Sequence, residues 1–413
     1  MTYASPRFHR AARPALALAV ALLCTVAAPA STRRPPAVVV TAVSDYAPGR
    51  YTGKLEPSPP HADGNPGRAV IISWPGRAER FVFSHEASYC PLFELPSGAA
   101  MANQFFEGNL GEAELMNQFG RRERNSFVDV MESRPDRAWV RWTYFAVNQN
   151  DDTVPRLRGT EDYFAFPNGL VLRKASYTSL LPDQPIGYST QPVELFGVAP
   201  VGASLADLFT RDPAHGDYRV LAAVDLYGEG RYEIYWSDDG AVRRVGDDAT
   251  LAAISRSRGF ALVLPFRDRL MFAVLGEASG FPAGNSQLID HSTPGAEGGA
   301  GWGVGRWDHW PIGWLNSQAH NWKPGSPYPW SFGSIGHFLV PEGQRIREFW
   351  KDYSALCEDK AFNRWTEQRV FGVLMGHARD WRDVHRIGRA WLDQGAACLQ
   401  PDTVARLPES REP

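Results

Sequence analysis

The sequence predicts a mainly β protein: a large antiparallel β-sandwich with a few short helices, two of them near the C-terminus. Three observations support this fold class. Short runs rich in β-branched and aromatic residues, separated by turn residues, recur between residues 68 and 342. The chain carries 38 glycines and 32 prolines, which suit an architecture of many short strands and turns. Helical spacing of hydrophobic residues begins only after residue 343.

The body of the sandwich is expected at residues 68–342. Its clearest strand segments are 68–74, 80–84, 126–132, 137–147, 169–179, 218–224, 230–236, 260–266 and 270–276. Asp239-Gly240 predicts a hairpin turn, because both central residues of that turn type need a positive φ. Ser204 and Asp207 have the spacing of a capping box, which predicts one short helix.

Residues 343–400 are expected to form two helices and a strand that pack on this body. Helical spacing occurs at Ile346, Phe349, Trp350, Tyr353 and Leu356, and again at Trp381, Val384, Ile387, Ala390 and Trp391. The segment 369–375 between them is expected to be one more strand. Residues 401–413 are expected to be a disordered tail.

The N-terminal segment has the features of a secretory signal. Basic residues and no acidic one precede an apolar run at 15–26, which closes on Ala28-Pro29-Ala30. The run is shorter than the roughly 20 apolar residues of a membrane-spanning helix. We therefore expect residues 1–30 to be a cleavable signal peptide and the protein to be secreted, to the extracellular space or the periplasm, with no integral membrane segment after cleavage. Residues 31–67 are expected to be a loose arm with one short strand at 37–43.

The charge balance argues against one class of partner. Removing the three arginines of the signal segment from 43 basic residues leaves 40 against 46 acidic ones, a formal charge of −6. A mildly acidic chain without a basic block is a poor nucleic-acid binder.

Three cysteines follow the expected cleavage site. Cys357 and Cys398 flank the C-terminal helical segment and are the natural disulfide pair in an oxidising compartment, which leaves Cys90 as a buried free thiol. No cysteine or histidine spacing predicts zinc, and we expect no cofactor. The segment 148–152 has the oxygen ligands for a structural Ca²⁺, although an acidic surface loop is the simpler interpretation.

The most unusual segment spans residues 294–337. After a glycine-rich stretch it places six of the fourteen tryptophans within 29 residues, together with three histidines: Trp302, Trp307, Trp310, Trp314, Trp322, Trp330, His309, His320 and His337. Indole rings are good platforms for sugar rings, and histidine titrates near neutral pH. The segment therefore indicates either a glycan-binding cleft or part of the hydrophobic core.

A second cluster of polar residues lies in the first half of the chain. Its members are His85, Glu86, Tyr89, Asn103, Gln104, Glu107, Glu114, Arg141, Tyr144, Glu161, Asp162, Tyr163 and Arg173. His85 and Tyr89 have the groups of a base and an acid, and Arg141 or Arg173 could hold a carboxylate in a two-pronged hydrogen-bonded pair. Each residue alone is more often structural, so the functional hypothesis depends on their convergence.

This second cluster carries a resemblance to a known family. The order Arg-Phe-x-Phe, Tyr-x-Pro, Asn-Gln-Phe-x-Glu, Ala-Glu-x-Met, Arg-x-x-Val-x-Trp-x-Tyr and Phe-Pro-Asn-Gly-x-x-x-Arg-Lys resembles a family of secreted bacterial proteins linked to polysaccharide breakdown. Some of these carry laminin-G-like modules, and the wider group is related to ulvan-type polysaccharide lyases. Asp308-His309-Trp310-Pro311 is similar to the family's His-Trp-Pro signature. The resemblance implies a β-sandwich of the supersandwich type that acts on anionic glycans.

The chain departs from the family pattern at four positions. His85 stands near Tyr89 where an arginine is expected, and Phe127 stands where the pattern has a histidine. Arg141 and Thr143 replace the histidine and arginine of a His-Trp-Arg-Tyr motif. Any chemistry that those basic residues perform in the relatives is therefore lost or moved in this chain.

The leading hypothesis is a lyase that cleaves a uronic-acid-containing polysaccharide or oligosaccharide by β-elimination. This reaction needs a group that neutralises the C6 carboxylate, a base for the C5 proton and an acid for the leaving oxygen. The candidates for the carboxylate are Arg141 or Arg173, assisted by Asn103 and Gln104; for the base, His85 or His309; for the acid, Tyr89, Tyr144 or Tyr163. Glu114, Trp307, Trp310 and Trp314 are further candidates for substrate binding.

Two alternatives remain open at this point. The first is a non-catalytic glycan-binding or surface protein that uses the tryptophans as a platform. The second is a glycoside hydrolase with two carboxylates about 5 Å or about 6.5–9.5 Å apart, drawn from Glu86, Glu107, Glu114, Glu161 and Asp162.

Overall fold

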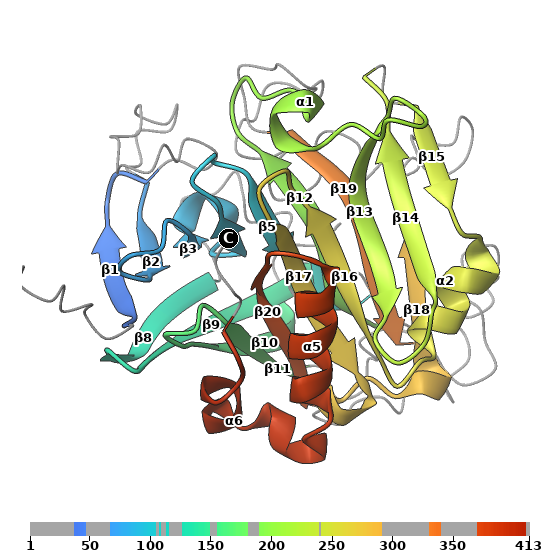
Figure 1. Ribbon diagram of the computed structural model, residues 1–413. Coiled ribbons are helices and arrows are strands. Elements are labelled where there is room, and N and C mark those ends of the chain that lie inside the picture. Colours follow the sequence, from blue (N-terminus) through green and yellow to red (C-terminus); the bar gives the residue numbers. More distant parts are fainter. Residues whose placement is uncertain are drawn as a thin grey trace, which may run out of the picture. The chain divides into compact units, whose positions relative to one another are not determined.

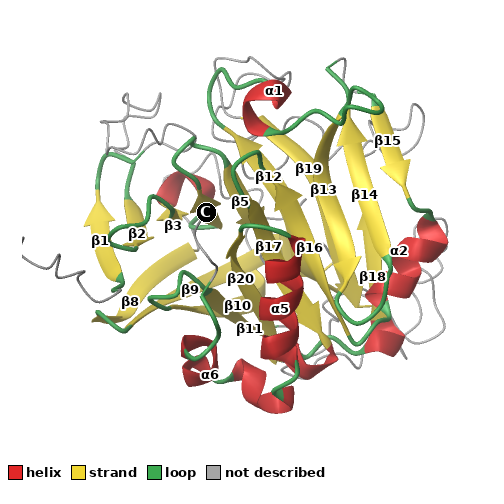
Figure 2. Ribbon diagram, in the orientation of Figure 1, coloured by secondary structure: helices red, strands yellow, loops and turns green. Residues whose placement is uncertain are grey.

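The computed structural model describes residues 37–46, 67–104, 107–108, 113–114, 126–148, 155–180, 190–238, 241–290, 330–339 and 370–409. Strands dominate, and every pair of neighbouring strands in these ranges is antiparallel (Figure 2). The predicted fold class is therefore confirmed. The described residues contain no helix with the length and apolar character needed to cross a membrane.

The strands form two large sheets. The first runs in the order β18 (Ser286–Asp290), β19 (Trp330–Leu339), β12 (Thr190–Ala199), β5 (Ala100–Asn103), β4 (Pro91–Glu94), β3 (Arg80–Ser84), β2 (Ala69–Ser73) and β1 (Val39–Val43). The second runs in the order β8 (Ser126–Arg134), β9 (Arg137–Asn148), β10 (Pro155–Ala165), β11 (Val171–Ser179), β20 (Val370–Ala378), β17 (Leu270–Gly276), β16 (Gly259–Pro265), β13 (Tyr218–Asp225), β14 (Arg231–Trp236) and β15 (Val242–Val245) (Figure 1). Two short strands, β6 (Glu107–Gly108) and β7 (Ala113–Glu114), connect β12 to β9.

The main hydrophobic core lies between the inner faces of the two sheets. Phe81 and Phe83 of β3 meet the ring of Tyr163 on β10, with ring centroids 5.4 and 5.1 Å apart. Further along, Phe332 of β19 packs edge-on against Phe266, which follows β16, at 5.8 Å. Alternate residues of each strand point inward, so these contacts place the aromatic residues of both sheets in one layer.

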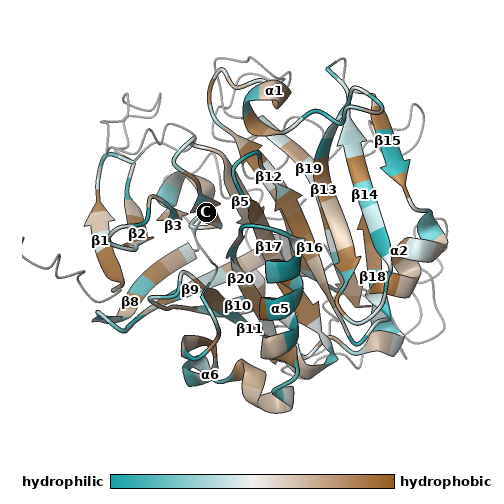
Figure 3. Ribbon diagram, in the orientation of Figure 1, coloured by the Kyte–Doolittle hydropathy of each residue, from teal (hydrophilic) through white to brown (hydrophobic). Residues whose placement is uncertain are grey.

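Helix α5 (Trp381–Leu392) covers the outer face of the second sheet. Its buried side chains Val384, Ile387 and Trp391 join one cluster with Val263 and Leu374 from the strands. Burying each such side chain contributes roughly 1.5–3 kcal/mol. Figure 3 shows hydrophobic strands behind α5 and hydrophilic residues on the side of the helix that faces the viewer. The predicted C-terminal helix and the strand before it, β20, are thus confirmed, whereas the helix expected from Ile346 lies outside the described residues.

The prediction of a disordered C-terminal tail is wrong for the part of the tail that the structure describes. Residues 401–405 form the short helix α6 (Pro401–Ala405), with the proline in its first turn. Val404 and Leu407 are buried in the same cluster as α5, and the amide of Asn168 donates hydrogen bonds to the carbonyl oxygens of both residues, at 3.0 and 3.3 Å. Two apolar anchors and a buried amide therefore hold a segment whose local sequence looks polar.

The short strand predicted in the N-terminal arm is confirmed as β1. β1 is the edge strand of the first sheet and pairs with β2 from Val39↔Ser73 to Val43↔Ala69. Tyr46, just after β1, is buried and donates a hydrogen bond to Glu94. The pairing of β1 and the buried ring of Tyr46 attach this segment to the first sheet.

The capping box and the hairpin pairing predicted in the middle of the chain are confirmed. Ser204 and Asp207 form a capping box at the start of the short helix α1 (Leu205–Leu208). β14 and β15 pair with Trp236 opposite Val242, as a hairpin requires, although Asp239 and Gly240 at its tip lie outside the described residues. A second short helix, α2 (Asp248–Ser255), follows β15.

Candidate functional site

Four of the predicted site residues converge around one carboxylate on the inner face of the second sheet. The Arg173 guanidinium donates to both oxygens of Glu161, from Nε to Oε2 at 2.7 Å and from Nη2 to Oε1 at 2.6 Å. The hydroxyls of Tyr144 and Tyr163 donate to the same two oxygens, at 2.9 and 2.5 Å. Arg173 Nη1 also donates to Asn103 Oδ1 at 3.3 Å. We call these five residues the Glu161 network.

The Glu161 network is inaccessible. The side chains of Arg173 and Glu161 are 1% and 0% exposed, and both tyrosines and Asn103 are buried. Burial lowers the pKa of Arg173, but the Glu161 carboxylate more than compensates, so the pKa lies above its ordinary value. Burial and the adjacent Glu161 hold the pKa of Tyr163 well above its usual range. The network thus holds an ion pair and uncharged phenols, the form in which all of their hydrogen bonds are satisfied.

This burial corrects three predicted roles. Tyr144 and Tyr163 cannot donate a proton to a polymer, and Arg173 cannot hold a substrate carboxylate, because all three are enclosed between the sheets. Asn103 is occupied in the same way, since its amide also contacts Met375 Sδ at 3.8 Å. Part of the polar cluster therefore converges, but these residues form a structural network in the core.

Arg141 lies on the opposite face of the same strands. Its Nε and Nη2 donate to the two oxygens of Asp162 at 2.8 and 2.9 Å, and the Trp139 indole donates to Asp162 Oδ1 at 2.7 Å. The hydrogen bonds that Arg141 donates to Asp162 are the main cause of the raised pKa of Arg141. Glu161 and Asp162 therefore face opposite sides of the sheet, which excludes them as the two carboxylates of one hydrolase site.

The His85–Tyr89 segment forms a tight turn that leaves β3. A single 3-10 turn, His85–Ala87, is followed by two non-glycine residues in the left-handed region, Ser88 at φ 48° and Tyr89 at φ 64°. These two are the only positive-φ residues other than glycine in the described part of the chain. Such backbone costs about 1–3 kcal/mol per residue and is often found at functional sites.

The turn brings the predicted base and acid together. The rings of His85 and Tyr89 meet edge to face, with centroids 5.6 Å apart. The backbone fixes this geometry, since Tyr89 N–H donates to Ser84 O at 2.7 Å and His85 N–H donates to Arg68 O at 2.8 Å. The structure therefore places the rings of this predicted pair in contact.

Tyr89 lines a pocket of about 600 Å³ between the edge strands of the two sheets. β1 and β2 of the first sheet and β8 of the second contribute to its lining. The lining residues are Ala42, Val43, Ser44, Asp45, Arg68, Ala69, Val70, Tyr89 and Val128. Arg68 supplies an exposed cation and Asp45 an exposed carboxylate. Arg68 is not among the residues predicted from the sequence, because only the pairing of β2 with β3 brings it beside His85.

The remaining predicted site residues are separate from this pocket or undescribed. Gln104 is buried beside Glu194, to whose carbonyl oxygen its backbone N–H donates at 2.9 Å. Glu114 belongs to β7, but its side chain is outside the described set, as are those of Glu86 and Glu107. His309, Trp307, Trp310 and Trp314 lie outside the described residues as well.

One histidine of the tryptophan-rich segment is described, and it belongs to the core. His337 of β19 is fully buried, and its ring lies 4.9 Å from that of Phe281 and 5.8 Å from that of Phe260. Burial lowers its pKa to about 3. Trp330, at the start of the same strand, is also fully buried. For these two residues the core interpretation of the segment is confirmed.

The expected Cys357–Cys398 bridge is not formed. Cys398 is a free, buried thiol that donates to Ala278 O at 3.3 Å, and burial raises its pKa to about 12. Cys357 lies outside the described residues. Cys90 is buried and forms no disulfide, as predicted.

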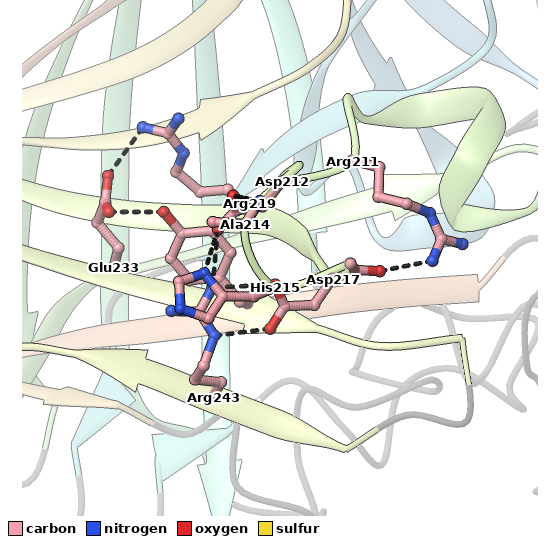
Figure 4. A network of polar contacts seen from close by, with 10 residues as sticks. Arg211, Asp212, Ala214, His215, Asp217, Arg219, Glu233 and Arg243 are labelled. Carbon is pink, nitrogen blue, oxygen red and sulfur yellow. Dashed lines mark hydrogen bonds and ion pairs between the residues drawn. The ribbon is translucent and has the colours of Figure 1, made fainter.

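A polar network just before β13 has the carboxylates and the histidine of a cation site, but an arginine already supplies its positive charge. Asp212, His215 and Asp217 bring ligand-type atoms within 4.8 Å of one another. Arg243 donates from Nε to Asp217 at 2.7 Å and from Nη2 to Asp212 at 3.1 Å, and His215 hydrogen-bonds Asp212 at 2.9 Å (Figure 4). The guanidinium supplies the positive charge that a metal ion would bring, so we assign no metal here. Most of the 148–152 segment, the predicted Ca²⁺ candidate, lies outside the described residues.

Comparison with known proteins gives no family assignment: no protein-family model matches the chain, and no curated protein matches it.

Proposed function

We propose that the protein binds an anionic polysaccharide at the Tyr89 pocket and cleaves a uronic-acid-containing chain by β-elimination. One observation carries the proposal: Tyr89, held in a left-handed backbone conformation and in ring contact with His85, lines the same pocket as Arg68. A phenol, an imidazole and a guanidinium are the three kinds of group that this reaction uses.

Each group has a defined role in the proposed reaction. Arg68 binds the C6 carboxylate and stabilises the charge that develops on it as the C5 proton is removed. The neutral imidazole of His85 accepts that proton, and the Tyr89 phenol donates its own proton to the glycosidic oxygen. The C4–O bond breaks, a C4–C5 double bond forms, and the products are a new reducing end and an unsaturated uronate. Solvent returns both side chains to their starting protonation states.

The location of such a substrate agrees with the expected signal peptide. Acidic polysaccharides are found outside the cytoplasm, so a secreted protein would meet them. We therefore include secretion in the proposal, and we expect mass spectrometry of the exported protein to show cleavage after Ala30.

The test is formation of the unsaturated product from a panel of uronate polymers, such as alginate, polygalacturonate, hyaluronan and ulvan. Ultraviolet absorbance of the conjugated double bond reports turnover. We expect Tyr89→Phe and His85→Gln to lower kcat by roughly 10²- to 10⁴-fold, because each removes a proton-transfer group. Tyr227→Phe is the matched control, since this phenol contacts Asp393 of the segment that follows α5, away from the pocket.

Two results would overturn the proposal. The first is a folded wild-type protein that forms no product from any polymer of the panel. The second is turnover on one polymer that Tyr89→Phe and His85→Gln leave unchanged.

A non-catalytic glycan-binding protein is the second candidate, and the Glu161 network favours it. Tyr144, Tyr163 and Arg173 are enclosed there, so three of the groups predicted for the reaction cannot reach a substrate. Such a protein would bind an acidic oligosaccharide in isothermal titration without forming product. Its affinity would fall in Arg68→Ala and survive in His85→Gln.

A further inference from the structure

The strained turn that presents Tyr89 is held by a residue from the opposite sheet. Ser126, the first residue of β8, donates its hydroxyl to the carbonyl oxygen of Ser88 at 2.6 Å. Ser88 directly precedes Tyr89, and both have left-handed backbones. Because a left-handed non-glycine residue persists only where its surroundings determine it, this hydrogen bond is well placed to keep the turn in its present form.

A second residue fixes the direction of that hydroxyl. The Trp142 indole N–H donates to Ser126 Oγ at 2.7 Å. An indole only donates, so the serine oxygen must act as its acceptor, and the serine's own proton is left for the Ser88 carbonyl. Ser88 and Trp142 are 0% exposed and Ser126 is 3% exposed, so water does not compete for these hydrogen bonds.

The Glu161 network packs against Trp142, the residue that orients the Ser126 hydroxyl. The Trp142 ring lies 4.6 Å from that of Tyr144, and the Tyr144 hydroxyl donates to Glu161. Ser126 also faces Tyr144 directly across the β8–β9 pair. The buried network therefore does not react with substrate, but it packs against the residues that hold the turn.

We infer that Ser126 is a positioning residue: its hydroxyl, oriented by Trp142, holds the Ser88 carbonyl and so places the Tyr89 phenol at the pocket. The expected loss of activity rests on the proposed function. The position of the Tyr89 ring follows from the geometry alone.

The test compares Ser126→Ala with Ser126→Thr, which keeps a hydroxyl and suits a strand. Ser176→Ala is the matched control, because it removes a part-buried serine hydroxyl from the same sheet that contacts a carbonyl oxygen, Thr160 O, at 3.4 Å. On the polymer that the wild type cleaves, we expect Ser126→Ala to lower kcat by roughly 10- to 100-fold with KM little changed, since misplacing a reacting group acts on the chemical step. Ser126→Thr should restore most of kcat, and Ser176→Ala should have the wild-type value.

A second readout does not depend on activity. The protein is labelled with 3-fluorotyrosine, and the ¹⁹F resonance of Tyr89 is identified as the one that Tyr89→Phe removes. We expect this resonance to move or broaden in Ser126→Ala and to stay in place in Ser176→Ala. If Ser126→Ala does not fold, Trp142→Phe, which removes the indole N–H and keeps an aromatic ring, should move the same resonance.

The two readouts separate the possible failures. A wild type without turnover contradicts the proposed function, while the Tyr89 resonance still decides the positioning role. An unchanged Tyr89 resonance in folded Ser126→Ala overturns the inference, whatever the activity. A lowered kcat with an unmoved resonance, or an equal loss in Ser176→Ala, would also overturn it.

Discussion

Strands β9, β10 and β11 carry two arginine–carboxylate pairs, one on each face of the second sheet, and the two pairs differ in their exposure to solvent. Arg173 and Glu161 lie between the sheets, with side chains 1% and 0% exposed. Arg141 and Asp162 lie on the outer face, with side chains 35% and 20% exposed. Both pairs are held by two hydrogen bonds of similar length. Residue type and pair geometry are therefore nearly equal, and burial is the main difference.

Burial decides what each pair does. Glu161 also accepts hydrogen bonds from two tyrosines, and Arg173 donates to the Pro192 carbonyl at 2.9 Å, so every member needs the others. The outer pair has water as an alternative partner. We conclude that an arginine in a polar cluster of the sequence indicates substrate binding only once it is known which face of the sheet carries its side chain.

The largest expected effect comes from breaking the inner pair. Arg173→Met removes the guanidinium and leaves the Glu161 carboxylate buried without its counter-charge. We expect the free energy of unfolding to fall by about 3–5 kcal/mol, as measured by urea denaturation followed by circular dichroism.

The double variant Arg173→Met, Glu161→Leu is the matched control. It removes both charges, so it should be clearly more stable than Arg173→Met alone, because replacing a whole buried pair costs far less than breaking it. A single variant that loses less than about 1 kcal/mol would show that the inner pair behaves like a surface pair.

A pH series extends the comparison to a buried group that is neutral. Burial lowers the pKa of His337 from 6.5 to about 3, so below pH 6.5 the unfolded chain binds a proton that the folded chain does not. The stability is therefore complete above about pH 6.5 and falls on acidification, at about 1.4 kcal/mol per pH unit for this residue until its folded pKa is reached. Over the two units below 6.5 this approaches 3 kcal/mol.

Denaturation of His337→Leu between pH 7 and pH 4.5 tests this expectation. The slope of unfolding free energy against pH should be smaller in the variant by about one proton. Burial also lowers the pKa of His377 to about 3, so this residue should still contribute its own proton to the slope. Equal slopes in the wild type and in His337→Leu would contradict the assignment.

The smallest effect is expected for the outer pair. Asp162→Asn removes the charge but keeps an acceptor for Trp139, so we expect a loss below about 1 kcal/mol that decreases further as salt is added. A loss comparable to that of Arg173→Met would remove the distinction between the two faces.

Much of the fold could be predicted from local sequence. Short strands rich in β-branched and aromatic residues, the 381–391 helix and the Ser204 capping box depend on neighbours in the chain, and the structure has each of them. The α6 segment could not be predicted in this way, because Val404 and Leu407 are ordered by a distant cluster and by Asn168.

The candidate site was predictable only in part. His85 and Tyr89 are four residues apart, so one turn brings them together. Arg68 reaches the pocket through the pairing of β2 with β3, and Ser126 reaches the turn from the other sheet. Neither of these two contacts can be predicted from the spacing of residues along the chain.

The sequence by itself determined the mainly β class, the antiparallel strand segments, the C-terminal helix and a set of candidate polar residues. Only the tertiary structure decided which of them lie inside. Side chains alternate along a strand, so a shift of one residue in register would exchange the faces of Glu161 and Asp162. That register is set by long-range pairing and packing, and it is why Arg173 is a core residue while Tyr89 lines a pocket.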